Sequence, residues 1–161
     1  MTGEEFNKSV DLYADGIYRF ALKTLKDQEK AKDTVQDTYE KLWVKHSEVS
    51  YEKVKSYLFT TAYHASIDLI RKEKKKGEFE SSSMLETSSN EHYSDIQEVL
   101  SRAVDQLPEI QKSVLLLRDY EGYSYEEIGE ITGLNESQVK VYIFRARLFL
   151  KNYFVSIENV I

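Results

Sequence analysis

A cluster of basic side chains near the end of the sequence has the chemistry to bind a polyanion. Lys140, Arg145, Arg147 and Lys151 follow one another against the single acid Glu136. Arginine and lysine can neutralise phosphates while neighbouring side chains reach the edges of bases. The segment therefore predicts binding to a nucleic acid. A helical hairpin whose arginines simply face water is the alternative.

The residues before this cluster predict how it is positioned. Ser124 and Glu127 have the spacing of a capping box, which starts a helix. Gly133 permits a tight turn with positive φ, and Asn135 with Gln138 three residues later can cap a second helix. The order helix, glycine turn, capped helix is the helix-turn-helix plan, in which the second helix enters the major groove.

Periodicity within these two helices separates an inner from an outer side. Ile128 and Ile131 are expected to point inward, Val139 and Ile143 to pack the second helix on the first, and Gly129 to leave room for a close helix crossing. The outer face of the second helix is then Ser137, Lys140, Val141, Phe144 and Arg145.

A second candidate for nucleic-acid binding lies in the middle of the chain. Residues 71–76, RKEKKK, hold five bases and one acid, and Tyr57, Phe59 and Tyr63 precede them. Basic residues with interleaved aromatic side chains suit single-stranded nucleic acid, because each stacked base is worth about 1–3 kcal/mol. A set of core aromatics followed by a soluble basic helix end explains the same residues, so both interpretations remain open here.

Apolar spacings of three and four residues run through the chain and predict helices only. We expect helices over 10–25, 28–46 and 55–76, with an exposed loop at 47–54. Beyond residue 95 we expect a helix carrying Ile96, a second one that starts at Pro108 and stops near Gly122, and the helix-turn-helix. Tyr39, Leu42 and Trp43 are expected to be core residues. The fold class predicted is all-α.

Charge is distributed unevenly along the 161 residues, whose net charge is -6. Residues 77–95 are serine-rich and hold five acids and no base, which predicts a flexible linker between domains 1–76 and 96–161. Charges farther apart than about 10 Å scarcely interact at 0.1 M salt. An acidic linker is therefore compatible with a basic nucleic-acid face elsewhere.

Composition argues against catalysis. The chain has no cysteine, and its histidines, His46, His64 and His92, are scattered without the spacing of metal ligands. Asp68, four residues after His64, is an acid partner more typical of a surface contact than of a catalytic pair. We predict no enzyme activity, no metal, no cofactor and no small-molecule substrate.

The first residues and the hydropathy of the sequence predict the cellular compartment of the protein. The start, MTGEEFNKSV, lacks a basic segment followed by an apolar one, and no run reaches the roughly 18 apolar residues of a membrane span. Together with the absence of cysteine, this predicts a soluble cytoplasmic protein.

Three stretches of the sequence follow the pattern of one known family. They are AKDTVQDTYEKLW (31–43), SYLFTTAYHASIDLIRKEKK (56–75) and LPEIQKSVLLLRDYEGYSYEEIGEITGLNESQVKVYIFRAR (107–147). Taken together they resemble the extracytoplasmic-function (ECF) sigma factors of the sigma-70 superfamily of bacterial transcription initiation factors. The first stretch resembles region 2.2 of that family, the second resembles regions 2.3 and 2.4, and the third is similar to region 4 along its whole length. The resemblance implies two small helical domains, sigma region 2 and sigma region 4, joined by the linker.

The family's functional residues are carried over to matching positions. Region 2.2 binds the clamp coiled coil of core RNA polymerase, which implies contacts by Asp33, Gln36, Asp37 and Glu40. Loop 47–54 corresponds to the segment that captures a flipped base of the -10 element. The -10 contacts implied are Tyr57, Phe59, Tyr63, His64, Arg71, Lys72, Lys74 and Lys75. The -35 contacts implied are Ser137, Lys140, Val141, Phe144, Arg145 and Arg147.

Some positions depart from the family's pattern. The chain has Ala62-Tyr63-His64 where the family commonly has Ala-Arg-Asn, and Tyr57 where tryptophan is frequent. Thr132 replaces a usual apolar residue at the end of the first helix of the motif.

The resemblance implies a promoter-specificity subunit that binds core RNA polymerase and both promoter elements and has no active site. It also implies inhibition by an anti-sigma factor, often membrane-anchored, that inserts between the lobes. A stand-alone helix-turn-helix regulator is the alternative. Selective binding of the free protein to duplex DNA would favour the regulator, and a requirement for core polymerase would favour the sigma factor.

Overall fold

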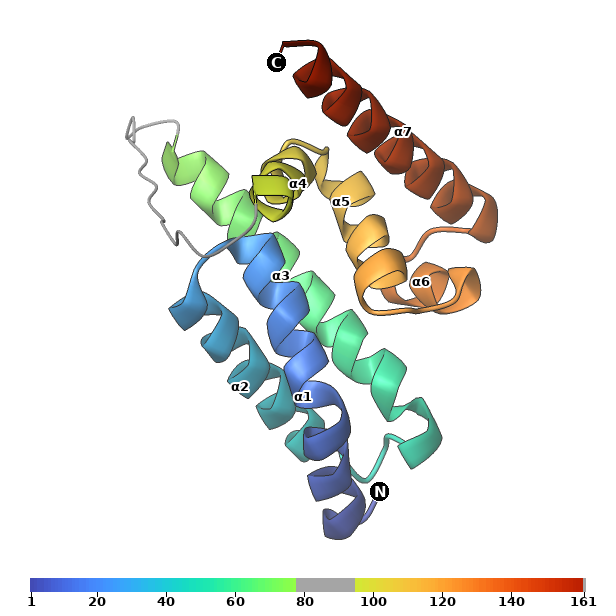
Figure 1. Cartoon of the computed structure of the whole chain (residues 1–161). Coiled ribbons are helices and arrows are strands. Elements are labelled where there is room, and N and C mark those ends of the chain that lie inside the picture. The colour runs from blue at the N-terminus through green and yellow to red at the C-terminus, as the bar shows by residue number, and fades with distance from the viewer. Residues whose placement is uncertain (78–94, 161) are drawn as a thin grey trace.

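The computed structural model of the chain describes residues 1–77 and 95–160, all of whose regular elements are helices (Figure 1). The N-terminal lobe contains α1 (Gly3–Leu25), α2 (Gln28–Val44), the short 3₁₀ turn η1 (Tyr51–Lys53) and α3 (Val54–Gly77). The C-terminal lobe contains α4 (Asp95–Asp105), α5 (Glu109–Leu115), the π-helical turn η2 (Leu116–Tyr120), α6 (Tyr125–Thr132) and α7 (Glu136–Val160). The predicted all-α fold is confirmed, while the predicted linker falls almost wholly on residues 78–94, outside the described residues.

Local signals set the ends of the helices in the N-terminal lobe. The Thr2 hydroxyl accepts from the Glu5 N–H and the Glu5 carboxylate accepts from the Thr2 N–H, so α1 begins with a capping box. Helix α1 ends at Lys26, whose left-handed φ is 59°. At the start of α2, the side chain of Asp27 accepts from the Lys30 N–H. These caps make α1 and α2 an antiparallel pair against which α3 packs.

The core of this lobe confirms most of the predicted inward positions and corrects one. Ile17, Leu42 and Leu58 are fully buried, and Tyr39 is buried with its hydroxyl donating to the Ser9 carbonyl at 2.8 Å. Trp43 was expected in the core, but that prediction is wrong, since its side chain is 51% exposed. One residue along an α-helix rotates the side chain by about 100°, so Trp43 leaves the core when Leu42 occupies it.

In the C-terminal lobe, α4, α5 and α6 all contact α7. Helix α5 begins after Pro108, as predicted, and η2 widens its last turn before Gly122, whose φ is 78°. Residues 113–117 are buried together with Ile128, Ile131 and the inner side of α7. No helix in the described residues has both the length and the apolar character required to cross a membrane.

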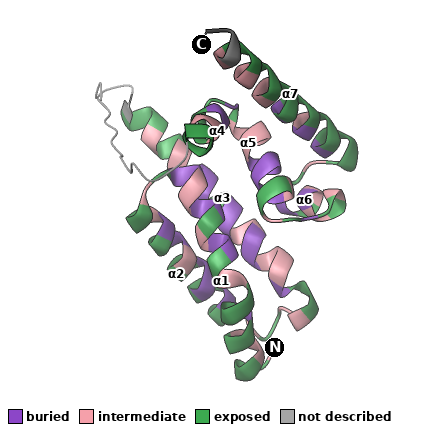
Figure 2. Ribbon diagram, in the orientation of Figure 1, coloured by how far each residue is buried: buried purple, intermediate pink, exposed green. Residues whose placement is uncertain are grey.

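The two lobes pack directly on one another. Helix α3 contacts α6, and buried side chains of both lobes form one continuous hydrophobic cluster. At the junction the rings of Phe59 and Tyr123 meet edge to face, with their centroids 4.9 Å apart. Figure 2 shows buried residues on α3 and α5, whereas exposed residues predominate along α7. This packing of the lobes was not predicted from the sequence.

Candidate nucleic-acid interface

The first helix of the predicted helix-turn-helix, α6, begins with a reciprocal cap. The Glu127 N–H donates to the Ser124 hydroxyl at 3.0 Å, and the Ser124 N–H donates to the Glu127 carboxylate at 2.9 Å. The hydrogen bond from the Ser124 backbone is the largest factor that lowers the pKa of Glu127, and Lys55 adds to the effect. The predicted capping box is confirmed.

The turn between α6 and α7 depends on two glycines. Gly133 has a φ of 83° and donates its N–H to the Gly129 carbonyl at 2.8 Å. A Cβ on Gly129 would lie 2.8 Å from the carbonyl oxygen of Leu134. Gly129 therefore allows the turn itself to fold back closely, whereas the sequence had suggested a close crossing of another helix.

Asn135 and Gln138 form the second cap and orient α7. The Gln138 N–H donates to the Asn135 side chain at 2.8 Å, and the Asn135 N–H donates to the Gln138 side chain at 3.0 Å. Val139 and Ile143 are buried against the rest of the lobe. Helix α7 thus begins at a fixed point and presents its opposite side outward, as the helix-turn-helix prediction requires.

The outward side of α7 combines apolar and basic side chains. Phe144 is 66% exposed and Val141 is 44% exposed, and Leu148, four residues after Phe144, is exposed too. We call Ser137, Lys140, Val141, Phe144, Arg145 and Leu148 the α7 reading face. All six are exposed. Leu148 was not in the predicted set, although its spacing of three and four residues from its neighbours could have revealed it.

Arg147 differs from Lys140 in where its ion-pair partner lies: Lys140 pairs with Glu136 of α7 itself at 3.6 Å, whereas the partner of Arg147 lies on another element. Its guanidinium donates two hydrogen bonds to Asp119 in η2, one of them from Nε at 3.1 Å. This hydrogen bonding is the largest factor that raises the pKa of Arg147. The pair ties α7 to the π-helical turn, so in this structure Arg147 supports the reading face from beside it.

The predicted -10 residues are not gathered on one open surface. Phe59 and Tyr63 are buried, at 1% and 7% exposure, and burial raises the pKa of the Tyr63 hydroxyl. Tyr57 is partly exposed and His64 is exposed. Arg71 forms an ion pair with Glu109 of the other lobe at 3.5 Å, while Lys72, Lys74 and Lys75 are exposed.

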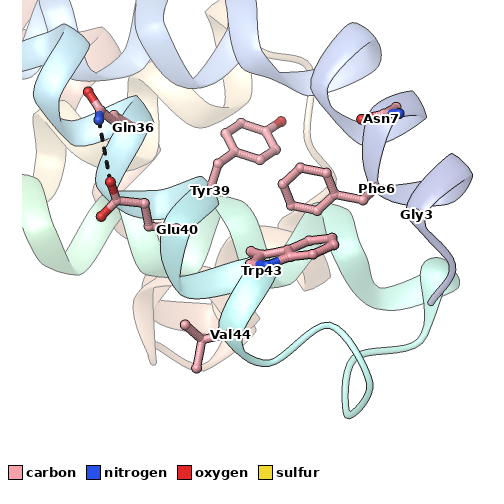
Figure 3. A pocket seen from close by; sticks show the side chains of 8 residues that line it. All are labelled: Gly3, Phe6, Asn7, Gln36, Tyr39, Glu40, Trp43 and Val44. Carbon is pink, nitrogen blue, oxygen red and sulfur yellow. Dashed lines mark hydrogen bonds between the residues drawn. The ribbon is translucent and has the colours of Figure 1, made fainter.

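The predicted polymerase-binding residues do share one side of α2. Asp33, Gln36, Asp37 and Glu40 are all exposed, and the Gln36 amide donates to the Glu40 carboxylate at 3.3 Å. Beside them an open pocket is formed between α1 and α2 (Figure 3). We call this the Trp43 pocket. Its lining residues are Gly3, Phe6, Asn7, Gln36, Tyr39, Glu40, Trp43 and Val44.

Aromatic contacts hold Trp43 at the edge of this pocket. Its ring meets Phe6 edge to face at 5.1 Å and stacks on His46 at 4.6 Å between centroids. Val44, the next residue, is 79% exposed. The pocket therefore presents apolar surface next to the carboxylates of α2. Sequence reasoning missed both residues, because a core assignment accounted for the spacing of Trp43.

Among the described residues, no group of three or more histidine, cysteine or acidic side chains is placed to hold a metal ion.

The predicted binding surfaces differ in how accessible they are. The outward side of the helix-turn-helix and the predicted polymerase-binding side of α2 are exposed to solvent. Part of the predicted -10 set is covered by the C-terminal lobe.

Two known protein families match the two lobes of the structure. Residues 10–76 match the sigma-70 region 2 family and residues 97–150 match the sigma-70 region 4 family. The ECF RNA polymerase sigma factor SigM of Bacillus subtilis is 32% identical over 145 residues, covering 87% of this chain and 89% of the relative. SigV of the same organism is 35% identical over 133 residues, covering 81% and 79%.

Solved structures share the fold. The sigma factor RpoE from Bartonella quintana, crystallised with the anti-sigma factor NepR, superposes with a TM-score of 0.79 at 24% identity, covering 94% of this chain and 97% of that chain. CnrH in complex with the cytosolic domain of CnrY superposes with a TM-score of 0.69 at 18% identity, covering 94% and 88%.

The chain belongs to the ECF sigma factors of the sigma-70 family. It is a promoter-specificity subunit of bacterial RNA polymerase, a non-catalytic class of protein that binds core polymerase and promoter DNA. The stand-alone regulator is not favoured, because the region 2 match accounts for a lobe that such a regulator would not need.

Proposed function

We propose that the α7 reading face binds the -35 element in the major groove. The observation that carries this proposal is the exposed row of Val141, Phe144 and Leu148 beside Lys140 and Arg145, on a helix whose start is fixed by a cap. Apolar side chains suit the methyl group of thymine, and arginine suits guanine or a phosphate. Ser137 lies in the first turn of α7 and can donate to a phosphate or a base edge.

The α2 face and the Trp43 pocket form the proposed site for the clamp coiled coil of core polymerase. Exposed carboxylates beside an aromatic pocket suit a partner helix with basic residues and one apolar anchor, because buried aromatic contacts dominate the affinity of such interfaces. On this chain the polar rim is formed by Asp33, Gln36, Asp37 and Glu40, and Trp43 lines the pocket that would receive the anchor.

The -10 element is proposed to bind along α3. Tyr57, Phe59, Tyr63 and His64 would contact the melted strand, loop 47–54 would hold a flipped base, and the basic end of α3 would neutralise phosphates. Unstacking a base costs a few kcal/mol, which aromatic contacts can offset. Arg71, Lys72, Lys74 and Lys75 form that basic end.

In this proposal the chain makes and breaks no covalent bond, and nucleotide addition stays with the polymerase. It would act in the cytoplasm, with residues 1–76 and 96–161 as separate binding domains. An anti-sigma factor is proposed as a further partner, since the sigma factor RpoE was crystallised in complex with the anti-sigma factor NepR.

Run-off transcription tests the proposal. Purified core polymerase is given genomic fragments of the source organism with and without this chain, and binding of the chain to core polymerase is measured alongside. We expect transcripts that depend on the chain and start at shared sequence elements. Absence of such transcripts, together with absence of core binding, would contradict the proposal.

A further inference from the structure

The π-helical turn η2 carries two charged side chains that leave the core together. The Glu121 N–H donates to the Leu116 carbonyl at 3.0 Å, five residues back, so the turn is wider than an α-helical one. Residues 113–117 are buried, whereas Arg118 is partly exposed and Asp119 is exposed. Wide turns of this kind are frequent at functional sites. Here the two side chains contact the two helices of the helix-turn-helix.

Three cations lie around the ring of Tyr125, the first residue of α6. The Arg118 guanidinium is 4.3 Å from the ring centroid, and the Lys140 ammonium of α7 is 5.5 Å from it. Arg147 is the third, since hydrogen bonding to Asp119 is the largest factor that raises its pKa and Tyr125 adds to that effect. Like charges this close repel one another. Asp119 therefore supplies a counter-charge where α6, α7 and η2 meet.

The contact between Asp119 and Arg147 is bidentate. Nε and Nη2 of the guanidinium donate to the two carboxylate oxygens, at 3.1 Å and 2.5 Å. The Arg147 side chain is 49% exposed and the Asp119 side chain is 36% exposed. Surface ion pairs usually contribute little to stability, and bidentate arginine–carboxylate geometry is the main exception. Asp119 therefore restrains the direction of the Arg147 side chain, while its loss should leave the fold intact.

Without this restraint, Arg147 would stand in a row of cations along α7. Residues seven apart in an α-helix lie almost above one another and about 10 Å apart, which is the relation between Lys140 and Arg147. Lys151 follows four residues later on the same side, and all three residues are exposed. A row of this kind neutralises phosphates whatever the base sequence. Asp119 engages the middle cation of the row.

We propose that Asp119 is a positioning residue for sequence discrimination at the -35 element. It holds Arg147 on η2, so that this cation makes no phosphate contact and α7 keeps the orientation that presents its reading face. The inference rests on the proposed function, because it takes the α7 reading face as the -35 site. Release of Arg147 has two effects: it adds a contact to the backbone of any duplex, and it loosens the tie that orients α7 toward the bases.

Binding of the holoenzyme to two labelled promoter duplexes tests this role. Core polymerase carrying the full chain is titrated with a fragment whose -35 element is intact and with one whose -35 element is scrambled. We expect Asp119→Asn to bind the scrambled fragment about threefold more tightly than wild type, and its preference for the intact fragment to fall about threefold. Its affinity for the scrambled fragment should also drop about threefold more between about 50 and 200 mM salt, because one more phosphate is neutralised.

Glu98→Gln on α4 is the matched control. It removes the same charge from an exposed acid that also pairs with an arginine, Arg102 at 3.1 Å, and should bind both fragments as wild type does. Asp119→Glu keeps a carboxylate within reach of Arg147 and should retain the preference of the wild type.

Removing the cation itself gives a test that does not depend on Asp119→Asn. In Arg147→Gln the preference for the intact fragment should fall, because α7 loses its tie to η2, while the salt dependence stays that of the wild type. The double variant Asp119→Asn/Arg147→Gln should lose the additional salt dependence of Asp119→Asn, since no arginine is left to release.

Two results would overturn the proposal. If Asp119→Asn binds both fragments as wild type does, or binds both equally weakly with an unchanged salt dependence, Asp119 does not set the preference. If Arg147→Gln makes the salt dependence shallower, Arg147 already binds a phosphate while Asp119 is present. Failure of the proposed function looks different, because the wild-type holoenzyme itself would then not distinguish the intact from the scrambled element, and the inference would fall with it.

Discussion

Single residues decide which surfaces of this protein are available to partners. Trp43 and Leu42 are adjacent in sequence, yet Leu42 is buried and Trp43 is half exposed at the edge of a pocket. Periodicity alone could not separate them, because both fit an apolar stripe of ordinary width. The structure resolves the ambiguity through Phe6, which contacts the Trp43 ring from α1.

Replacing Trp43 tests whether the pocket binds polymerase. We expect Trp43→Ala to weaken binding to core polymerase by about 2 kcal/mol, because a partly exposed aromatic ring in a pocket is a typical hot spot. Leu12→Ala is the matched control, since Leu12 is a large apolar residue of similar exposure on α1 that does not line the pocket. A titration of labelled core polymerase measures both, and equal affinities would remove Trp43 from the interface.

The ends of individual helices follow from local sequence signals. Both caps of the helix-turn-helix were predicted from residue spacing and are present, because a capping box joins residues three apart and needs no distant partner. The positive φ of Gly133 was predicted on the same basis. The π-helical turn η2 was not, since the apolar run before it fits an ordinary α-helix.

The cap of α6 predicts a pH dependence of stability. The pKa of Glu127 is lowered in the folded protein below its ordinary value of 4.5. Its carboxylate therefore contributes stability above that value and loses the contribution as pH falls through the folded-state pKa. We expect Glu127→Gln to lower the free energy of unfolding near pH 7, and the difference from wild type to shrink as the solution is acidified below 4.5.

Urea titrations across this pH range measure the effect. Glu126→Gln serves as the control, because Glu126 is an exposed acid in the same first turn and experiences the same helix dipole. A difference between wild type and Glu127→Gln that is the same at both ends of the range would contradict the role assigned to the charge.

The packing of the two lobes on one another could not be predicted from the sequence. Arg19 and Glu121 are 102 residues apart, and nothing local in either segment indicates the other. The sequence left open whether Phe59 and Tyr63 are core or nucleic-acid residues, and the structure buries both. Their -10 role stays a prediction that requires the lobes to separate.

The acidic net charge of the chain is compatible with a basic DNA-binding face on α7. The net charge is -6, yet acids of the C-terminal lobe face bases of the N-terminal lobe, while the α7 reading face keeps Lys140 and Arg145 outward. An acidic chain can therefore carry a basic reading face, because the acids lie elsewhere and because polymerase supplies part of the affinity in the assembled complex.

The substitution Arg145→Ala tests whether α7 reads the -35 element. On a promoter mapped by run-off transcription, initiation is compared between the intact and a scrambled -35 element, and core binding is measured in parallel. We expect Arg145→Ala to lose about 1–3 kcal/mol of the preference for the intact element with core binding unchanged, while Arg102→Ala on α4 behaves as wild type. Undiminished preference, or loss of core binding, would contradict the claim.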